Sequence, residues 1–343
     1  MIIFILFEFG FYENGEEDIE MNEILKKISL IGIVPVVKIN DAEKAVPLAN
    51  ALSDGGIPTA EITFRTEQAE EAIARITREV PDMLVGAGTV LTTEQADRAI
   101  NAGAKFIVSP GLNPKVVEHC IKRGVPITPG CSSPSDIEQA IEFGLEVVKF
   151  FPAEALGGIK MLKALSGPYG NIKFMPTGGI DATNIKDYLS FSKVIACGGS
   201  WMVPENLIKQ GNFQKITILA REAIESILGF KIAHVGINCE SEEQAGGVAA
   251  SFSKLLNFDL YNGSSSIFAG NSTGNIIEVM KTPYKGKHGH IAIKTNYIDR
   301  AVNYITNKGY KFDQSTAKYD SNNKLQAIYL ENEVGGFAIH LVQ

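Results

Sequence analysis

The hydrophobic positions between residues 31 and 203 follow two spacings in turn. Short apolar runs predict buried strands, and each is followed by a stretch whose apolar residues recur every three to four positions, as on one helix face. The predicted strands are Gly32–Ile39, Thr59–Phe64, Leu84–Val90, Phe106–Pro110, Pro126–Gly130, Val147–Phe151, Phe174–Thr177 and Val194–Gly198. Eight strand–helix steps predict an α/β fold, a compact (β/α)8 TIM barrel, with a doubly wound parallel sheet as the alternative.

The segments between these strands carry helix signals. The predicted helices include Asp41–Asp54, Glu67–Arg78, Thr93–Gly103, Pro114–Gly124 and Ser135–Gly144. Proline follows Asn113 and Ser133 at two helix starts, and glycine follows the last turn of three helices. These start and stop signals support the alternation of strand and helix.

The pattern changes near Phe230, where the glycine-rich strand ends stop and a new strand-like run begins. Two motif pairs then repeat: His234-Val-Gly-Ile with His290-Ile-Ala-Ile, and Gly274-Asn-Ile-Ile-Glu278 with Gly336-Phe-Ala-Ile-His340. A helical pattern follows the first strand of each copy, at Glu242–Leu256 and Tyr297–Lys308. Residues 230–343 are therefore predicted to form an α+β domain of paired βαβββ modules, after a barrel at residues 21–229.

The first twenty residues differ from the rest. Met1–Tyr12 is strongly apolar but too short to span a bilayer, and it lacks the charged start and cleavage site of a signal peptide. Glu13–Glu20 is acidic, and an amphipathic helix pattern begins just after Met21. Residues 1–20 are predicted to be a loosely ordered N-terminal extension, and no segment predicts a membrane span.

Composition and charge limit the classes of molecule that the protein is expected to bind. The 343 residues are 45% hydrophobic and 21% charged, which is typical of a soluble globular protein, and the formal net charge of -7 disfavours nucleic acid and anionic membranes. An anionic ligand must then be held by local groups. The four cysteines have no metal-binding or redox spacing, which predicts reduced thiols in a cytoplasmic protein.

Lys149 is the strongest candidate for chemistry. It lies in the run Val147-Val-Lys-Phe-Phe151, which predicts a strand buried on both faces. Lysine is rarely buried there, and burial disfavours the ammonium form, which leaves a lone pair able to form a Schiff base with a carbonyl. The alternative is a lysine at a strand end that reaches solvent or pairs with a carboxylate.

Polar residues and glycines gather at the other predicted strand ends, where barrels carry their chemistry. Gly178-Gly179 and Gly198-Gly-Ser200 follow the seventh and eighth strands, the usual place for a phosphate held by backbone N–H groups. Gly86-Ala-Gly88 is not a dinucleotide fingerprint, because Leu91 stands where the third glycine would be.

Residues 24–228 resemble the 2-keto-3-deoxy-6-phosphogluconate (KDPG) aldolases, class I aldolases of the (β/α)8 type. The matching motifs are Glu61-Ile-Thr-Phe-Arg65-Thr66, Gly86-Ala-Gly-Thr89-Val90, Ser109-Pro-Gly111, Lys149-Phe-Phe-Pro-Ala-Glu154, Pro176-Thr-Gly-Gly-Ile180 and Gly198-Gly-Ser-Trp201. The resemblance implies that Lys149 forms the Schiff base and that Glu61 moves protons. It implies a substrate-binding set of Arg65 and Thr89 for the carboxylate, Phe151 as an apolar wall, and Thr177, Gly178, Gly179 and Ser200 near the phosphate. Lys38 replaces an arginine common in the family.

The resemblance implies reversible cleavage of KDPG to pyruvate and glyceraldehyde 3-phosphate, of 4-hydroxy-2-oxoglutarate to pyruvate and glyoxylate, or of both. It also implies a homotrimer and no cofactor for the aldolase. A different phosphate-binding barrel enzyme, an isomerase or decarboxylase, is the alternative. Its activity would survive Lys149→Ala, whereas that of the aldolase would not.

Residues 230–343 resemble the glyoxalase-like, vicinal-oxygen-chelate superfamily, on the phase of the repeat. The resemblance places divalent-metal ligands at His234, Glu278, His290 and His340, although the fourth position is usually acidic. Two alternatives remain open. The histidines could be half-buried strand residues, and the whole segment could be a non-catalytic module for oligomerisation or ligand sensing.

Overall fold

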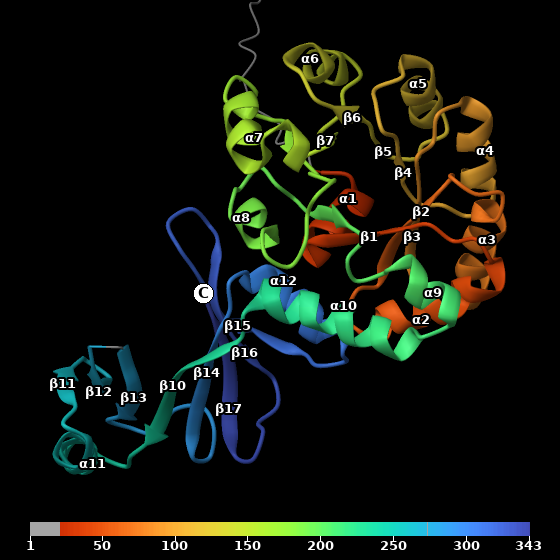
Figure 1. Cartoon of the computed structure of the whole chain (residues 1–343). Helices are drawn as coiled ribbons and strands as arrows, with labels where there is room; N and C mark the ends of the chain where they lie inside the picture. Colours follow the sequence, from red (N-terminus) through yellow and green to blue (C-terminus); the bar gives the residue numbers. More distant parts are fainter. Residues whose placement is uncertain (1–20, 273) are drawn as a thin grey trace, which may run out of the picture.

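The computed structural model describes residues 21–272 and 274–343, and the predicted extension at residues 1–20 lies outside them. Figure 1 shows the α/β part of the chain joined to a separate mixed sheet at its C-terminal end. Within the described ranges, no helix is both long enough and apolar enough to cross a membrane.

The first part is a curled parallel sheet of the TIM-barrel kind. Its strands are β1 (Ile33–Val37), β2 (Thr59–Thr63), β3 (Leu84–Gly88), β4 (Ile107–Val108), β5 (Ile127–Thr128), β6 (Gly130–Cys131), β7 (Val147–Phe150), β8 (Lys173–Phe174) and β9 (Cys197–Gly199). The order β5-β4-β3-β2-β1-β9 forms one arc and β6-β7-β8 the other. Bridges from Phe174 to Val194 and from Thr177 to Gly198 join the arcs beside β9.

The other junction between the arcs is Pro129, which divides the predicted strand Pro126–Gly130 in two. Thr128 pairs with β4, whereas Gly130 pairs with Lys149 of β7. Proline has no N–H to donate to a sheet, and here its carbonyl accepts from the amide of Lys149 at 2.9 Å. The sheet therefore continues through the break, and each arc keeps its own register.

Helix α1 (Glu23–Ile31) precedes the first strand, and the other helices follow the strands and lie outside the sheet (Figure 1). They are η1 (Ala42–Lys44), α2 (Ala45–Asp54), α3 (Ala69–Glu79), α4 (Thr93–Asn101), α5 (Pro114–Lys122), α6 (Pro134–Glu142), η2 (Glu154–Leu156), α7 (Gly158–Ser166), α8 (Ile185–Leu189), α9 (Glu205–Gln210) and α10 (Phe213–Leu228). The predicted caps are present: the Asn113 and Ser133 side chains accept backbone N–H groups at the starts of α5 and α6.

Two apolar clusters follow from strand alternation, because successive side chains point to opposite faces of the sheet. One cluster joins the outer strand residues to the helices. The inner cluster is smaller: Leu25 and Ile28 of α1 pack with Val34, Val147 and Met175 from the strands. Since α1 leads directly into the start of β1, it covers the N-terminal end of the barrel and leaves the C-terminal ends of the strands for the site.

The C-terminal sheet has eight strands in the order β11-β12-β13-β10-β14-β17-β16-β15. They are β10 (Lys231–Asn238), β11 (Asp259–Asn262), β12 (Ser266–Asn271), β13 (Gly274–Met280), β14 (Gly289–Lys294), β15 (Phe312–Tyr319), β16 (Leu325–Leu330) and β17 (Phe337–Val342). Helix α11 (Glu242–Leu256) follows β10, and α12 (Ile298–Asn307) follows β14. The central pair β10 and β14 is antiparallel, and each has a parallel neighbour, β13 or β17, on its other side.

The two sheets are joined through helices. Helix α10 ends at Gly229 in a left-handed conformation, and β10 begins two residues later. The Thr295 hydroxyl donates to the Leu228 carbonyl at 2.8 Å, and the side-chain amide of Asn296 donates to the Ile227 carbonyl at 3.0 Å. Helix α12 also packs against α1. The C-terminal domain is thus attached at the end of the barrel that α1 covers.

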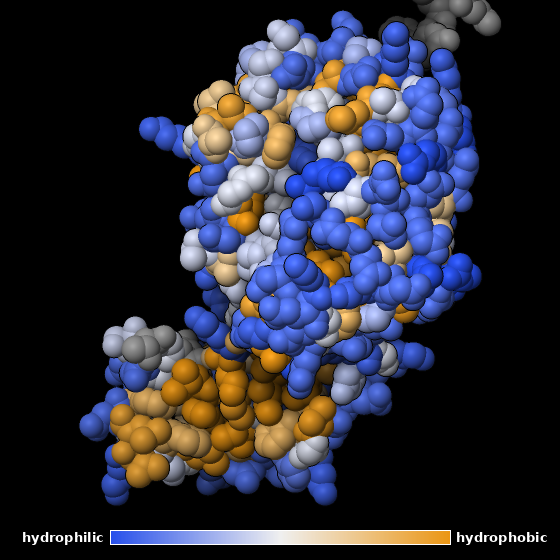
Figure 2. Space-filling model, turned by 45° about the vertical axis from the view of Figure 1, so that its right-hand side comes forward, coloured by the Kyte–Doolittle hydropathy of each residue, from blue (hydrophilic) through white to orange (hydrophobic). Residues whose placement is uncertain are grey.

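Apolar side chains gather on the surface of the C-terminal domain in Figure 2, whereas the barrel face drawn above it is mostly polar. Exposed apolar residues of the domain include Ile232, Leu255 and Leu260. An apolar groove of about 260 Å³ also lies there, lined by Phe230, Ile293, Ile305, Leu330, Ile339 and Leu341. Helices α11 and α12 therefore leave part of this sheet uncovered.

Candidate functional site

Lys149 lies inside the barrel. It is two residues beyond Val147 of the inner cluster, on the same side of β7, and its side chain is only 5% exposed. Its Nζ lies 4.8 Å from the centre of the Phe151 ring. Across residues 21–272 and 274–343, no carboxylate or hydrogen-bond acceptor pairs with this Nζ. The amine contacts the Phe151 ring and is not held in an ion pair, so it is available for chemistry.

Glu61 is a second buried and unpartnered group. The residue is 1% exposed, and neither Oε1 nor Oε2 has a hydrogen-bond partner. Its neighbour across the strands is Gly88: a Cβ there would lie 1.8 Å from Glu61 Oε1. The carboxylate therefore needs a glycine at this position. A buried carboxylate without a partner is costly, which points to a functional reason for its placement.

Two further polar side chains of the barrel are buried without partners. Thr128 on β5 and Thr177 after β8 are buried, and neither Oγ1 has a partner. A Cβ on Gly198 would lie 2.4 Å from Thr177 Oγ1, so glycine again makes room. Sequence reasoning named Thr177 but missed Thr128. The available signal was a threonine next to Ile127 of the outer cluster, because alternation turns Thr128 toward the interior.

The remaining predicted residues lie at the rim formed by the C-terminal ends of the parallel strands. Arg65 is exposed after β2, and its Nε donates to Thr63 Oγ1 at 3.1 Å. Thr63 in turn donates to the Val37 carbonyl at 2.8 Å, which ties the arginine to β1. Lys38 follows β1 and pairs with Glu205 of α9 at 3.0 Å. Arg65 is thus oriented at its base, and Lys38 already has a carboxylate partner.

Backbone conformation at the rim is unusual. Thr89, directly after β3, has a φ of 56°, which is uncommon for a residue with a branched side chain. Gly178 and Gly179 have φ values of 100° and 79°. Their neighbours are the Pro152 backbone and the Glu154 side chain, so this turn packs against the loop that follows Lys149. Ser200 is exposed immediately after β9.

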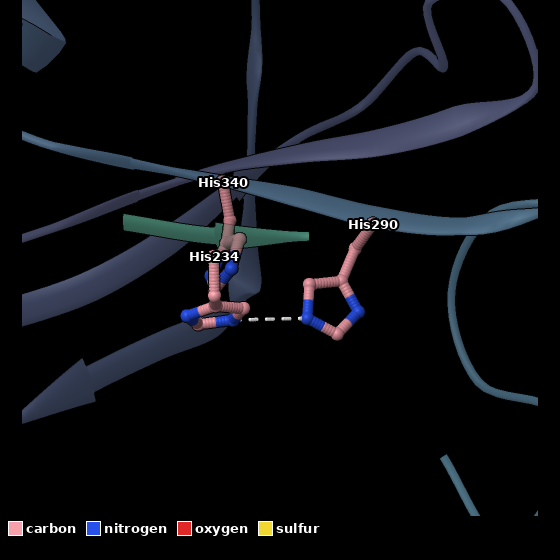
Figure 3. A group of neighbouring side chains, drawn as sticks. All are labelled: His234, His290 and His340. Atoms are coloured by element: carbon pink, nitrogen blue, oxygen red, sulfur yellow. Dashed lines mark hydrogen bonds between the residues drawn. The ribbon is translucent and has the colours of Figure 1, made fainter. Parts of the chain in front are cut away.

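A cluster of polar side chains lies in the centre of the C-terminal sheet. His234 comes from β10, Glu278 from β13, His290 from β14 and His340 from β17. His234 Nε2 lies 3.1 Å from His290 Nε2, and Glu278 Oε2 lies 3.2 Å and 3.1 Å from these nitrogens. Figure 3 shows the three imidazoles, with the His234–His290 contact dashed. The structure therefore brings all four predicted residues together.

His340 and Glu278 have altered proton affinities. Burial, and then the neighbouring His290 and His234, lower the pKa of His340 to about 3. Both of its ring nitrogens are buried without partners. Burial raises the pKa of Glu278, but hydrogen bonds with His234, His290 and Ser266 outweigh it and hold the pKa below its usual range. The cluster thus favours neutral His340 beside an ionised carboxylate, a donor set suited to a divalent metal.

Comparison with known proteins assigns the barrel. The family model for KDPG and KHG aldolase matches residues 22–219. The 2-dehydro-3-deoxy-phosphogluconate aldolase of Treponema pallidum is 52% identical over 207 residues, which are 60% of this chain and 99% of that protein. The KHG/KDPG aldolase of Escherichia coli K12 is 45% identical, over 56% of this chain and 91% of its own length.

Among solved structures, the KDPG aldolase of Legionella pneumophila with pyruvate captured as a covalent carbinolamine is 40% identical, with a TM-score of 0.57. The match covers 59% of this chain and 98% of that structure. These relatives are carbon–carbon lyases, and they match the part of the chain that carries Lys149 and Glu61. The chain therefore belongs to the KDPG and KHG aldolase family.

Proposed function

We propose that the barrel is a class I aldolase that cleaves KDPG, 4-hydroxy-2-oxoglutarate or both through a Schiff base on Lys149. The observation that carries the proposal is the buried Lys149 amine in a barrel that also holds the buried, unpartnered Glu61 carboxylate. The Legionella relative, with its covalent carbinolamine, supports the same chemistry. The barrel domain is assigned to residues 21–229.

The reaction begins when the unprotonated amine of Lys149 adds to the C2 carbonyl of the 2-keto acid. The carbinolamine loses water and becomes a protonated imine. A base removes the proton of the C4 hydroxyl, the C3–C4 bond breaks, and its electron pair moves into the imine to give an enamine and an aldehyde. Protonation at C3 and hydrolysis release pyruvate. Glu61 is the group assigned to these proton transfers, directly or through a water molecule.

The rim residues are assigned to substrate binding. Arg65 and Thr89 hold the C1 carboxylate, for which a planar guanidinium provides two parallel donors. Phe151 forms the apolar wall beside Lys149, 4.8 Å from its Nζ. Thr177, Gly178, Gly179 and Ser200 lie at the end of the barrel assigned to the phosphate, where positive φ angles let backbone amides converge on an anion. Lys38 has a supporting role, because Glu205 shares its charge.

Borohydride trapping tests the mechanism. The full chain is incubated with pyruvate, reduced, digested and examined by mass spectrometry, and cleavage of both substrates is assayed. We expect a reduced pyruvate adduct on Lys149, absent from Lys149→Met and present in Lys115→Met, whose lysine lies on the outer helix α5. Folded protein with no adduct, or cleavage activity that survives Lys149→Met, would favour a different phosphate-binding barrel enzyme.

For residues 230–343 we propose a glyoxalase-like domain of two βαβββ modules that binds a divalent metal ion. The element order β10-α11-β11-β12-β13 followed by β14-α12-β15-β16-β17 supports two equivalent units, joined at the central pair β10 and β14. The separations of 3.1–3.2 Å between ligand atoms support the metal. Metal–ligand bonds of about 2.1 Å place neighbouring ligand atoms roughly 3.0–3.4 Å apart.

His234, Glu278 and His290 would hold the ion, with His340 as the fourth ligand. The two ring nitrogens of His340 and Nδ1 of His290 have no partners, so the cluster has unused binding capacity. Ser266 donates its hydroxyl to Glu278 Oε1 at 2.7 Å and orients the carboxylate. A bound divalent ion would supply Lewis-acid chemistry to an oxygen ligand at this face of the sheet.

Metal analysis of the purified full chain tests this assignment. We expect near-stoichiometric divalent metal, lost in His234→Ala and retained in His288→Ala, which removes an exposed histidine of the same domain. Wild-type protein that stays metal-free after incubation with zinc, manganese and nickel would contradict the proposal. It would favour a non-catalytic module.

We also propose that the full chain forms the homotrimer implied by its family resemblance. Light scattering coupled to size-exclusion chromatography would then give three times the mass of the chain. A monomer or dimer at micromolar concentration would contradict this assembly.

A further inference from the structure

A cleft of about 570 Å³ lies where the barrel meets the C-terminal domain. Helices α1, α10 and α12 and the end of α2 line it, and contacts between α1 and α12 and between α10 and α12 hold its walls together. Helices α10 and α12 lie next to one another at the lower side of the barrel in Figure 1, and α12 also packs against α1. The volume is within the range of about 300–1,000 Å³ for small-molecule sites, which often lie at domain interfaces.

Arg300 of α12 is a buried cation in this wall, and its acidic neighbour Asp299 does not form an ion pair with it. Its Nε donates to the Ser29 carbonyl at 3.0 Å, and Nη2 donates to the Ile195 carbonyl at 2.9 Å. The guanidinium stacks on Tyr297 at 4.6 Å, while Nη1 is buried with no partner. Across residues 21–272 and 274–343, no carboxylate forms an ion pair with it. Burial lowers the pKa of Arg300, and the neighbouring Tyr297, Cys197 and Asp299 offset this only in part.

The remaining charges in the cleft are also unpaired. Lys27 of α1 and Lys308 at the end of α12 line it, and Lys308 lies 4.5 Å from the centre of the Tyr304 ring. Asp54 and Asp82 are the acidic lining residues. None of these four groups forms an ion pair with another residue of the described chain. With Arg300 included, the residues that line the cleft are three cations and two carboxylates, while Asp299 interacts with Arg300 from outside this lining.

We propose that this cleft binds a small anion, a carboxylate or a phosphate, with Arg300 as the central ligand. Nη1 supplies free N–H donors, a pattern that fits carboxylate or phosphate oxygens. Lys27 and Lys308 add positive charge from opposite sides of the domain boundary. An anion here contacts both domains, so binding stabilises their association. The site is separate from the barrel rim and from the histidine cluster.

Calorimetric titration of the full chain with inorganic phosphate, and separately with malonate, tests the proposal. We expect one anion site beyond that of the barrel, at least tenfold weaker in Arg300→Gln, because a charge-assisted bond is lost. Substitutions at two exposed positions should change the anion affinity in opposite directions. Lys308→Ala removes a positive charge and should lower the affinity about threefold. Asp82→Asn removes a negative charge and should raise the affinity by a similar factor.

The exposed variants test the proposal even if Arg300→Gln weakens the contact between the two domains. Binding of malonate alone identifies a carboxylate site, and binding of phosphate alone identifies a phosphate site. Affinities that do not respond to Lys308→Ala and Asp82→Asn overturn the proposal. A crystal soaked in selenate should also give an anomalous peak near Arg300 Nη1. A peak only at the barrel rim would overturn the proposal.

Discussion

At the scale of single residues, the barrel interior holds polar reactive groups in buried positions that lower the stability of the fold. The Glu61 carboxylate is buried without a hydrogen-bond partner, and the Lys149 side chain is 5% exposed with its Nζ over the Phe151 ring. Burial of such polar groups costs folding free energy, which points to a functional reason for their placement. Lys149 was predictable because a lysine inside an apolar run is visible in the sequence. Thr128 gave a weaker signal, because its alternation with Ile127 indicates a buried hydroxyl only once the strands are known to close into a ring.

Gly88→Ala tests how tightly Glu61 is held. The added methyl group would lie 1.8 Å from Glu61 Oε1, so the carboxylate must move. We expect kcat to fall by about a hundredfold, the order of a lost proton-transfer group. Steady-state cleavage assays measure this, and Gly170→Ala is the matched control because nothing lies within 4 Å of its Cβ position. Equal activity in both variants would contradict the assigned role of Glu61.

Lys149→Met tests the cost of the buried amine. Methionine has a similar volume and no charge to desolvate, so we expect a free energy of unfolding about 1 kcal/mol higher, together with loss of cleavage. Urea denaturation measures the first effect. Lys115→Met, on the outside of the barrel, should change stability by no more than about 0.5 kcal/mol. A clear loss of stability in Lys149→Met would mean that the lysine is structural.

At the scale of elements, local signals predicted most of the barrel. Caps such as Asn113 and Ser133 act within a few residues, so the sequence alone locates α5 and α6. Strand lengths were overestimated, and the break at Pro129 was missed. A strand ends where its hydrogen bonds to the neighbouring strands end, and those strands are distant in sequence. The ends therefore cannot be predicted from the local sequence.

Asp136 at the start of α6 gives a pH-dependent test. Burial raises its pKa, but bonds from the Ser132 and Ser133 amides, both at 2.9 Å, and from the serine hydroxyls outweigh it and lower the pKa. The folded-state value is then below the ordinary value of 3.8. The carboxylate therefore stabilises the fold fully above that pH, and the contribution is lost as the pH falls below it.

We expect Asp136→Ala to cost about 1 kcal/mol at pH 7 and progressively less below pH ~4. Urea unfolding at several pH values measures the difference from wild type. Glu142→Ala, at the exposed end of the same helix, is the control and should show little effect at any of these pH values. A difference that does not change with pH would exclude the charge of Asp136 as the cause.

At the scale of the whole molecule, two domains meet through helices at the closed end of the barrel. The repeat in the sequence predicted that His234 and His290 occupy equivalent strands, and the central pair β10 and β14 places them together. No local pattern predicted the packing of α12 on α1 and α10. That contact depends on surfaces shaped by both domains.

Deletion of residues 230–343 should separate stability from catalysis. The Treponema pallidum relative is matched over 99% of its length and has no such segment, so we expect the shortened chain to fold and to keep kcat within about twofold. We expect a lower melting temperature, because Leu228 and the outer face of α1 lose their cover. Calorimetry and cleavage assays measure the two effects. A large fall in kcat with a well-folded barrel would mean that the C-terminal domain takes part in catalysis.

Because α1 covers one end of the barrel, small molecules can reach the interior only from the other end. Under the proposed function, substrate would enter and product would leave at the opposite rim, where the C-terminal ends of the strands lie. The attached domain lies away from that rim, so under the proposed function released pyruvate would mix with the surrounding solution before it meets the histidine cluster. A different domain joined after Gly229 would leave access through that rim unchanged, which makes this barrel a suitable carrier for fused partners.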